Sequence, residues 1–289
     1  MGLPTARYIL ENGLEVYGFD INPKAVEVAK NHGIKAETSF NSLTECDAYV
    51  ICVSTLVDKN KPNIAPIIDS FKRISALKTN KETLISIEST MPPTSSRELF
   101  KQFLGPNYDL IHVPHRYWAE DPINHGVKQT RVIGAIDSKS LENGLGFYRD
   151  RLHIPLHVVD SIESAEACKV LENAYRFIQI AFAEEAKMIL QNQKIDFEEV
   201  REACNTKWNI LIPEAREGVG GHCLPKDILY LASLDSKHPL IDGAMKADQE
   251  YSVNQTKIRT SSIVQPVSAQ NERRIEGQVL GKYLVNERD

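Results

Sequence analysis

A glycine-rich loop next to a cysteine is the part of this sequence whose residue types point most directly to chemistry. The segment GVGGHC occupies positions 218–223, so three glycines lie just ahead of Cys223. Glycine lets the backbone approach a ligand closely, and a cysteine thiolate is a strong nucleophile. Asp227 follows four residues later, beyond Pro225, which is typical of a first helical turn. A packed glycine turn with an inert cysteine fits the same spacing.

Two polar residues in a long helical pattern form a second candidate group. Lys169 and Asn173 are four residues apart, which places them on one face of a helix. A lysine and an amide in this arrangement could stabilise an oxyanion, while the lysine orders a water molecule. A solvated polar pair has the same spacing, and the spacing alone favours that interpretation.

The beginning of the chain matches part of a dinucleotide-binding fingerprint. Gly2 precedes a helical pattern, and Asp20 ends a predicted strand, as the last glycine and the ribose-binding acid of G-x-G-x-x-G would. Lys24, one turn into the next helix, could neutralise a phosphate or could simply face solvent. The first two glycines are absent, and the alternative is that Asp20 only caps a turn.

Small polar residues follow two further predicted strands. Val53 and Thr55 come after the apolar run at 47–53, and Ser89 and Thr90 come after 83–87. Doubly wound folds bind ligands at the carboxyl ends of their strands, although serine and threonine are also common in turns.

Strand and helix patterns alternate through residues 1–160, which predicts a doubly wound, Rossmann-like α/β domain with a parallel sheet. The expected strands are 14–20, 34–36, 47–53, 83–87, 109–113, 131–135 and 156–159, and the expected helices are 6–11, 23–30, 64–74, 95–103 and 138–151.

A change of pattern at residue 161 predicts a second, all-α domain over 161–253. Its helix at 161–192 contains no glycine or proline and is apolar on more than one face, so we expect it to form a homodimer interface. Shorter helices are expected at 197–204 and 227–234. Residues 254–289 are polar and weakly periodic, which predicts a disordered tail.

Composition narrows the class of protein. The 289 residues include 34 Lys and Arg against 39 Asp and Glu, a balance that does not favour nucleic acid. No apolar run is long enough to span a membrane, and no secretory signal is visible. Five scattered cysteines without C-x-x-C spacing favour a reducing, cytoplasmic setting.

His112, His115 and His125 lack Cys or Glu at ligand spacing, so no metal site is expected.

Together these motifs resemble the UDP-glucose/GDP-mannose dehydrogenases, across residues 1–253. The resemblance rests on Gly2-Leu3-Pro4, Gly18-Phe19-Asp20, Ile51-Cys52-Val53-Ser54-Thr55, Ser89-Thr90-Met91-Pro92, Lys169-Val170-Leu171-Glu172-Asn173 and Gly220-Gly221-His222-Cys223-Leu224-Pro225-Lys226-Asp227. The GVGGHC form of the cysteine loop is more similar to the UDP-N-acetylhexosamine branch than to the UDP-glucose branch.

The resemblance implies an NAD-dependent, four-electron oxidation of the C6 alcohol of a UDP-sugar such as UDP-N-acetylmannosamine. Cys223 would form a thiohemiacetal and then a thioester, Lys169 and Asn173 would stabilise the oxyanion, and Asp227 with Lys169 would hold the hydrolytic water. Thr90 would lie beside the nicotinamide. The implied cofactor-binding residues are Gly2, Asp20, Lys24, Val53, Thr55, Ser89 and Thr90. The implied substrate-binding residues are His115, Arg116, Lys169, Asn173, Arg216 and Gly220.

The sequence also departs from the family pattern. His115 stands where the family usually has a glutamate that acts in proton transfer, so His115 or Glu120 would have to replace it. The first strand with two glycines and the C-terminal nucleotide-sugar domain are missing, and we therefore expect a chain truncated at both ends. The alternatives are an inactive remnant that dimerises or binds a nucleotide weakly, and a β-hydroxyacid dehydrogenase whose activity does not depend on Cys223.

Overall fold

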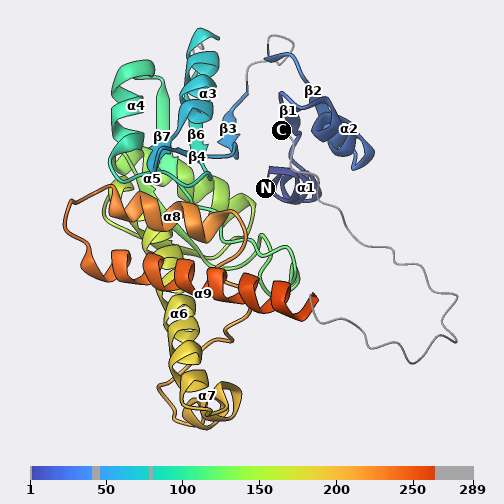
Figure 1. The fold of residues 1–289 in the computed structure, drawn as a ribbon. Helices are drawn as coiled ribbons and strands as arrows, with labels where there is room; N and C mark the ends of the chain where they lie inside the picture. Colours follow the sequence, from blue (N-terminus) through green and yellow to red (C-terminus); the bar gives the residue numbers. More distant parts are fainter. Residues whose placement is uncertain (1, 41–45, 78–80, 264–289) are drawn as a thin grey trace, which may run out of the picture.

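The structure is a computed structural model that describes residues 2–40, 46–77 and 81–263 of the 289, with side chains described up to residue 258. An α/β part is followed by a helical part (Figure 1). The strands are β1 (Tyr17–Phe19), β2 (Lys35–Glu37), β3 (Ala48–Ile51), β4 (Leu56–Asp58), β5 (Lys61–Asn63), β6 (Thr83–Ile87), β7 (Tyr108–His112), β8 (Arg131–Ala135) and β9 (Leu156–Val158). The helices are α1 (Gly2–Glu11), α2 (Pro23–Asn31), α3 (Ala65–Ala76), α4 (Ser95–Phe103), α5 (Ser138–Leu145), η2 (Gly146–Arg151, a π-helical turn), α6 (Ile162–Asn192), α7 (Phe197–Asn205), α8 (Cys223–Ala232) and α9 (Pro239–Ile263).

The main sheet has five strands in the order β3-β6-β7-β8-β9. Strands β3, β6 and β7 run parallel, as predicted, but β8 pairs antiparallel with β7. The direction changes because residues 113–130 return to the sheet without the helix that a parallel crossover requires. The Rossmann-like fold is as predicted, but β8 and β9, which are parallel to each other, run opposite to the other three strands of this sheet.

A second, two-stranded parallel sheet contains β1 and β2, paired from Tyr17 with Lys35 to Phe19 with Glu37. Within the described residues, these two strands pair only with each other. Helix α2 begins where the sequence predicts, because the Asn22 side chain caps the Lys24 N–H and Pro23 occupies the first turn.

Apolar layers cover both faces of the main sheet. Helices α3 and α4 pack on one face through residues such as Phe71 and Leu99, while α1, α5 and η2 cover the other through residues such as Ile9 and Tyr148. Every residue of β6 and β7 is buried. Burial on both faces is expected of strands in a sheet that helices cover on each side.

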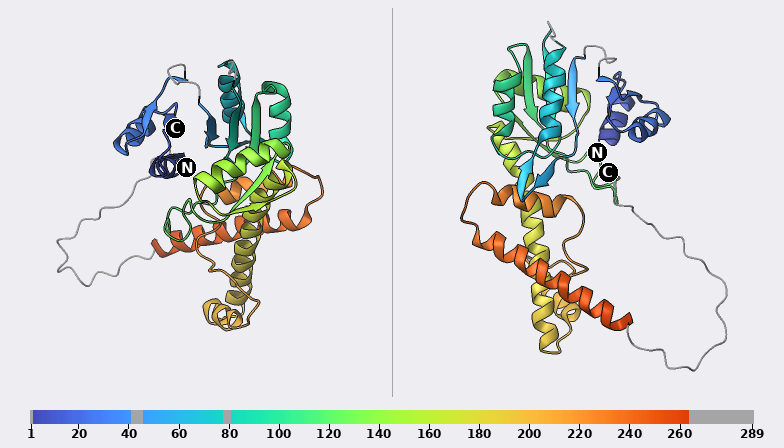
Figure 2. Two further views of the ribbon diagram at one scale, coloured as in Figure 1. Left: turned by 180° about the vertical axis from the view of Figure 1, so that it is seen from behind. Right: turned by 45° about the horizontal axis from the view of Figure 1, so that its top comes forward.

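Helix α6 is the axis of the helical part, with α8 and α9 packed across it and α7 at its far end (Figure 2). Its 31 residues correspond to about 45 Å. The start of α6 lies directly against β8, because a Cβ on Gly134 would come within 2.3 Å of the Ser161 carbonyl oxygen.

Two features of the helical part differ from the sequence prediction. Helix α8 starts at Cys223 rather than at Asp227, and α9 continues to Ile263, past the expected start of the tail at residue 254. The buried face of α9 consists largely of small residues such as Ala244 and Ala247, so its apolar periodicity is weak in the sequence. The remainder of the predicted tail, residues 264–289, lies outside the described part of the chain.

Candidate active site

Helices α6 and α8 bring four predicted residues together. Lys169 Nζ donates a hydrogen bond to Asn173 Oδ1 at 3.4 Å, and Asn173 Nδ2 donates to Asp227 Oδ2. The four-residue spacing on α6 therefore continues as a hydrogen-bond chain to α8. Cys223, the first residue of α8, lies one turn before Asp227.

The exposed Cys223 occupies a position suited to a nucleophile. The beginning of a helix carries unpaired backbone N–H groups and a partial positive charge, which favours negative charge that develops nearby. Because α8 begins at Cys223, the side chains of Cys223 and Asp227 lie on the same face of one helix.

Asp227 has a partner that the sequence analysis did not single out. Asp227 is fully buried, and Lys226 Nζ donates a hydrogen bond to its Oδ1. The same ammonium lies 4.2 Å from the centroid of the Tyr230 ring. A buried carboxylate needs compensation for the loss of its hydration, and Lys226 provides it. The adjacent Lys-Asp pair was present in the quoted motif, but the sequence did not indicate that Lys226 would turn inward.

Lys169 is half-buried and interacts with several charged groups. Burial lowers its pKa, whereas the carboxylates of Asp227 and then Glu172 oppose that shift. Cys223 acts on the pKa of Lys169 in the same direction as the two carboxylates. A lysine whose pKa is lowered releases a proton more readily and can help to orient or activate a water molecule.

The loops after β3 and β6 are joined to each other and to α8. The Ser89 hydroxyl donates to the Val53 carbonyl oxygen at 2.6 Å. Thr55 is buried, and the Tyr230 hydroxyl of α8 donates to the neighbouring Leu56 carbonyl at 2.8 Å. The predicted cofactor residues of these loops are thus connected to the helix that begins with Cys223.

The loop that contains Thr90 is fixed by a residue of α6. Glu166 is fully buried and accepts hydrogen bonds from the Thr94 N–H at 2.7 Å and the Ser96 N–H at 2.8 Å. These two groups open helix α4, directly after the loop. Glu166 lies about one turn before Lys169, so one helix holds both sides of the candidate site.

The predicted adenosine end of the cofactor site lies on the β1–β2 unit. Asp20 is exposed, and its Oδ1 accepts the Asn22 N–H at 2.8 Å, so it does cap a turn as well as end a strand. Lys24 is exposed at the start of α2. Gly2 lies against the end of β3, because a Cβ there would be 3.3 Å from Cys52 Cβ.

The positions of Asp20, Val53 and Ser89 fit part of a dinucleotide-binding site. The carboxyl ends of parallel strands and the start of the helix between them form the crevice where open α/β sheets bind ligands. Asp20 could accept hydrogen bonds from a ribose, and the joined loops at Val53 and Ser89 could border the nicotinamide. The two glycines that would let the backbone approach the pyrophosphate are not in this sequence.

His115 does not face an open site, contrary to its predicted role in substrate binding. Its side chain is 3% exposed. Its Nδ1 accepts the Tyr117 N–H at 3.0 Å, while its Nε2 lies 3.2 Å from the Thr5 hydroxyl, which donates to Glu88. Burial lowers the pKa of His115 to about 4, so the imidazole is neutral at pH 7.

Glu88 lies next to His115 and is the centre of a buried polar network. Arg131 donates to Glu88 Oε1 at 2.8 Å, and the Tyr148 hydroxyl donates to the same oxygen at 2.7 Å. Burial acts to raise the pKa of Glu88, but Arg131, His115 and Tyr148 together outweigh burial, and the pKa is lowered. His115 therefore belongs to a buried polar network that stabilises the ends of the strands.

The other predicted substrate residues lie in different surroundings. Arg116 forms a bidentate ion pair with Glu172, which lies on α6 about one turn from Lys169. Arg116 also donates a hydrogen bond to the Thr130 carbonyl oxygen at 3.0 Å. Arg216 is 78% exposed and pairs with Glu214 at 2.9 Å. Gly220 is also exposed. Glu172 was not predicted, although it lies within the quoted Lys169–Asn173 motif.

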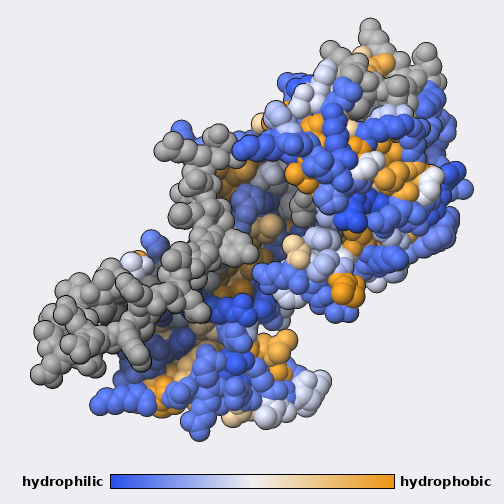
Figure 3. Space-filling view, turned by 90° about the vertical axis from the view of Figure 1, so that its right-hand side faces the viewer, coloured by the Kyte–Doolittle hydropathy of each residue, from blue (hydrophilic) through white to orange (hydrophobic). Residues whose placement is uncertain are grey.

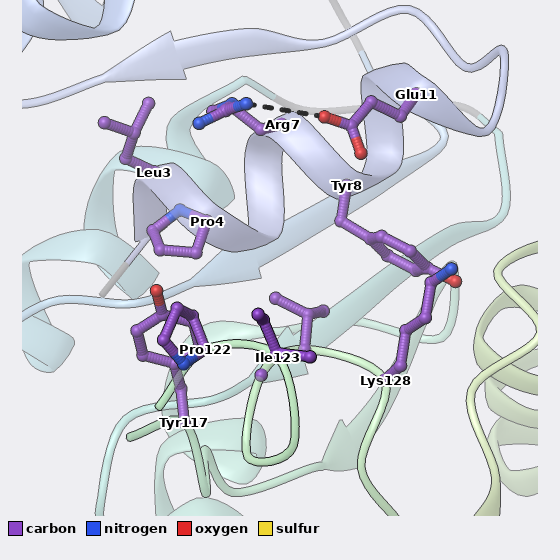
Figure 4. A pocket seen from close by; sticks show the side chains of 11 residues that line it. Leu3, Pro4, Arg7, Tyr8, Glu11, Tyr117, Pro122, Ile123 and Lys128 are labelled. Atoms are coloured by element: carbon purple, nitrogen blue, oxygen red, sulfur yellow. Dashed lines mark ion pairs between the residues drawn. The ribbon is translucent and has the colours of Figure 1, made fainter. Parts of the chain in front are cut away.

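A separate cavity of about 300 Å³ lies between α1 and the loop at 117–128 (Figure 4). Arg7 and Glu11 form an ion pair of 3.6 Å on its α1 side, and Lys128 approaches the Tyr8 ring from the loop. None of the predicted catalytic residues lines this cavity. It is therefore distinct from the arrangement at Cys223.

Within the described ranges, no three His, Cys, Asp or Glu side chains gather closely enough to hold a metal ion. Over the same ranges, no helix combines the length and the apolar character needed to cross a membrane. Among the described residues, Cys52, Cys168, Cys204 and Cys223 form no disulfide.

Comparison with known proteins gives relatives for both parts of the chain. The NAD binding domain of the UDP-glucose/GDP-mannose dehydrogenase family matches residues 27–151, and the central domain of that family matches residues 163–250. A UDP-N-acetyl-D-mannosamine dehydrogenase of Methanococcus maripaludis is 29% identical over 84% of this chain and 62% of its own length. Protein CapL of Staphylococcus aureus is 28% identical over 93% of this chain and 69% of its own.

Solved structures show the same fold. A UDP-D-ManNAc dehydrogenase of Pyrococcus horikoshii superimposes with a TM-score of 0.80 at 22% identity, covering 91% of this chain and 69% of that one. A 3-hydroxyisobutyrate dehydrogenase of Mycobacterium tuberculosis has a TM-score of 0.66 at 16% identity, covering 89% and 90%. The chain spans about 62% of the length of the first curated relative. With both domains matched in order, this chain belongs to the UDP-glucose/GDP-mannose dehydrogenase family.

Proposed function

We propose that this chain carries the catalytic core of an NAD-dependent nucleotide-sugar 6-dehydrogenase that acts on a UDP-N-acetylhexosamine such as UDP-N-acetylmannosamine. The observation that carries the proposal is the Lys169–Asn173–Asp227 hydrogen-bond chain beside Cys223. The names of the relatives support the substrate class. The branch resemblance of the cysteine loop points in the same direction.

The reaction assigns one task to each residue of this arrangement. NAD, when bound, supplies the hydride acceptor for each of two successive oxidations. Between them, the Cys223 thiolate adds to the C6 aldehyde to form a thiohemiacetal, whose oxidation gives a thioester. Water then cleaves the C–S bond, which releases the carboxylate and returns the thiol.

Lys169 and Asn173 are suited to stabilising the negative oxygen of these intermediates. The Lys169 ammonium and the Asn173 amide can donate hydrogen bonds to the negative oxygen that develops on C6. Asp227 holds the Asn173 amide from the other helix, and the Lys226 ammonium donates a hydrogen bond to Asp227 in its buried position. Asp227 thus orients Asn173, and with Lys169 it can position the hydrolytic water near Cys223.

We also infer a homodimer that forms through α6. Four large apolar side chains, Leu171, Tyr175, Phe182 and Ile189, are 58%, 62%, 57% and 57% exposed. Their spacings of four, seven and seven residues place them along one side of the helix. Apolar surface is also visible on the lower lobe in Figure 3, where α7 and the end of α6 lie. A continuous apolar stripe of this kind is typical of a protein interface.

Uronate formation from UDP-N-acetylmannosamine and NAD⁺ tests the proposed reaction. Substitution of Cys223 by alanine is expected to abolish the uronate, because no thioester can form. Cys204→Ala removes another exposed cysteine, on α7, and provides the matched control. Uronate produced by the Cys223→Ala variant at the wild-type rate would overturn the mechanism.

One observation favours a second candidate, a module that binds a nucleotide without turnover. Within the described residues, the strands β1 and β2 form a sheet separate from the main sheet. Isothermal titration with NAD⁺ and several UDP-sugars separates the candidates. Binding without uronate formation supports the second candidate, whereas NAD⁺ reduction with a β-hydroxyacid that survives Cys223→Ala indicates the 3-hydroxyisobutyrate dehydrogenase type of activity.

A further inference from the structure

The two halves of the predicted cofactor site lie on different sheets. The adenosine half, Asp20 and Lys24, belongs to the β1–β2 unit, whereas the nicotinamide half, Val53, Ser89 and Thr90, follows strands of the main sheet (Figure 1). Within the described residues, no strand pairing joins β1 or β2 to the main sheet. Because a dinucleotide spans both halves, other contacts have to fix one half relative to the other.

Helix α1 packs against both the β1–β2 unit and the main sheet. Leu3 and Ala6 lie in the apolar cluster of the β1–β2 unit. Ile9, further along the helix, is buried against the main sheet. Phe19, at the end of β1, adds an apolar contact with the cluster of α3. Apolar packing is non-directional, so these contacts hold the unit in place without fixing its orientation.

Thr5 supplies a directional contact from the same helix. Its side chain is buried, and its hydroxyl donates a hydrogen bond to Glu88 Oε2 at 3.1 Å. Glu88 directly precedes Ser89 and Thr90 in the sequence. The hydrogen bond therefore joins the first turn of α1 to the residue that leads into the nicotinamide half.

The Thr5 hydroxyl also has a donor on its other side. His115 Nδ1 accepts the Tyr117 N–H at 3.0 Å, so the proton of the neutral imidazole is on Nε2. His115 Nε2 lies 3.2 Å from Thr5 Oγ1 and can donate to it. With His115 donating to Thr5 and Thr5 donating to Glu88, the hydroxyl is held in one orientation.

Glu88 is a fixed acceptor for this hydroxyl. Arg131 and Tyr148 donate to its Oε1, and the Cys52 thiol, directly after β3, donates to its Oε2 at 3.6 Å. The backbone N–H of Glu88 donates to the Ile51 carbonyl oxygen at 2.9 Å. Thr5 is thus attached to a buried point that is itself tied to β3, β8 and η2.

We propose that Thr5 is a positioning residue whose hydroxyl, held between His115 and Glu88, orients α1 and thereby aligns the two halves of the NAD site. Without the hydroxyl the apolar contacts remain, but the β1–β2 unit can shift relative to the main sheet. The effect on α1 stands by itself. Its consequence for NAD rests on the proposed function and its cofactor site.

Hydrogen exchange of α1 in the full chain without ligand tests the first part of the proposal. Thr5→Val keeps the shape of the side chain but cannot donate, whereas Thr5→Ser keeps the hydroxyl. Thr83→Val makes the same change at a buried threonine that begins β6 and provides the matched control. Protection of the amides at 6–11 should fall by about tenfold in Thr5→Val only. Unchanged protection in Thr5→Val would refute the contact, and strand β6 reports whether the main sheet stays folded.

Isothermal titration with NAD⁺ and with AMP separates positioning from a general loss of structure. AMP needs only the adenosine half, whereas NAD⁺ needs both halves in register. Thr5→Val should bind NAD⁺ about tenfold more weakly and AMP as the wild type does, and Thr5→Ser should restore the affinity for NAD⁺.

Three results of the titration would contradict parts of the argument. An equal loss for both ligands would mean that Thr5 only stabilises the β1–β2 unit, and wild-type affinity of Thr5→Val for NAD⁺ would also overturn the positioning role. If the wild-type chain binds neither ligand, the proposed cofactor site fails, while the exchange of α1 still decides whether the Thr5 hydroxyl holds the helix.

Discussion

The buried imidazole of His115 predicts a specific weakness of this protein at acid pH. His115 is 3% exposed, and burial lowers its pKa from the ordinary 6.5 to about 4. The folded chain therefore binds fewer protons at this site than the unfolded chain between these two values. Stability contributed by His115 is present above about pH 6.5 and is lost as the pH falls toward 4.

The size of the effect follows from the displacement of the pKa. Each pH unit between the folded and unfolded values corresponds to about 1.4 kcal/mol, so the shift from 6.5 to about 4 corresponds to about 3 kcal/mol. His115→Gln keeps an N–H that can donate to Thr5 but cannot titrate. The stability of the wild type relative to this variant should therefore decrease by about 3 kcal/mol between about pH 7 and about pH 4.

Urea unfolding followed by circular dichroism measures this difference at each pH. His112 is also buried, and its pKa is lowered by burial to about 3, but it is present in both chains and its contribution cancels. His125→Gln, in the exposed loop nearby, controls for the type of substitution. A difference between wild type and His115→Gln that does not change with pH would show that water reaches the imidazole, and would restore the predicted substrate-binding role.

Three further predictions concern contacts of the site and of α6. Lys226→Ala leaves the buried Asp227 without its cation and should lower the free energy of unfolding by about 3 kcal/mol in urea titrations. A loss below about 1 kcal/mol would mean that water replaces the ammonium. Glu166→Ala removes two hydrogen bonds to the start of α4 and should cost about 2 kcal/mol in the same assay; unchanged stability would argue against this tie. Phe182→Glu should shift the chain to a monomer in sedimentation velocity, and a persistent dimer would exclude the α6 interface.

The fold was largely predictable where apolar patterns are strong. The strands at 83–87 and 131–135 and the helix at 95–103 have the predicted bounds, because the apolar residues of each form a clear pattern. The short hairpin β4–β5 was missed, since three-residue strands hardly form a pattern. The direction of β8 was missed because it depends on how residues 113–130 return to the sheet.

The candidate site, like the fold, was predictable from the sequence only in part. Helical spacing predicts that Lys169 and Asn173 share one face, whereas the place of Asp227 beside them was implied only by the family resemblance. The inward turn of Lys226 and the burial of His115 were not predictable, because they are set by neighbours that are distant in the sequence. His115, for example, lies near Thr5 and Glu88, which no local pattern relates to it.

Helix α6 explains why residues from such distant segments can act together. Glu166, Lys169 and Asn173 follow one another at spacings of three and four residues, so they share one face of a straight helix. Glu166 holds the loop with Thr90, while Asn173 holds Asp227 on the helix that begins with Cys223. The distance between the predicted hydride-transfer side and the nucleophile is therefore set by about two turns of one helix, and a rigid helix keeps that distance constant.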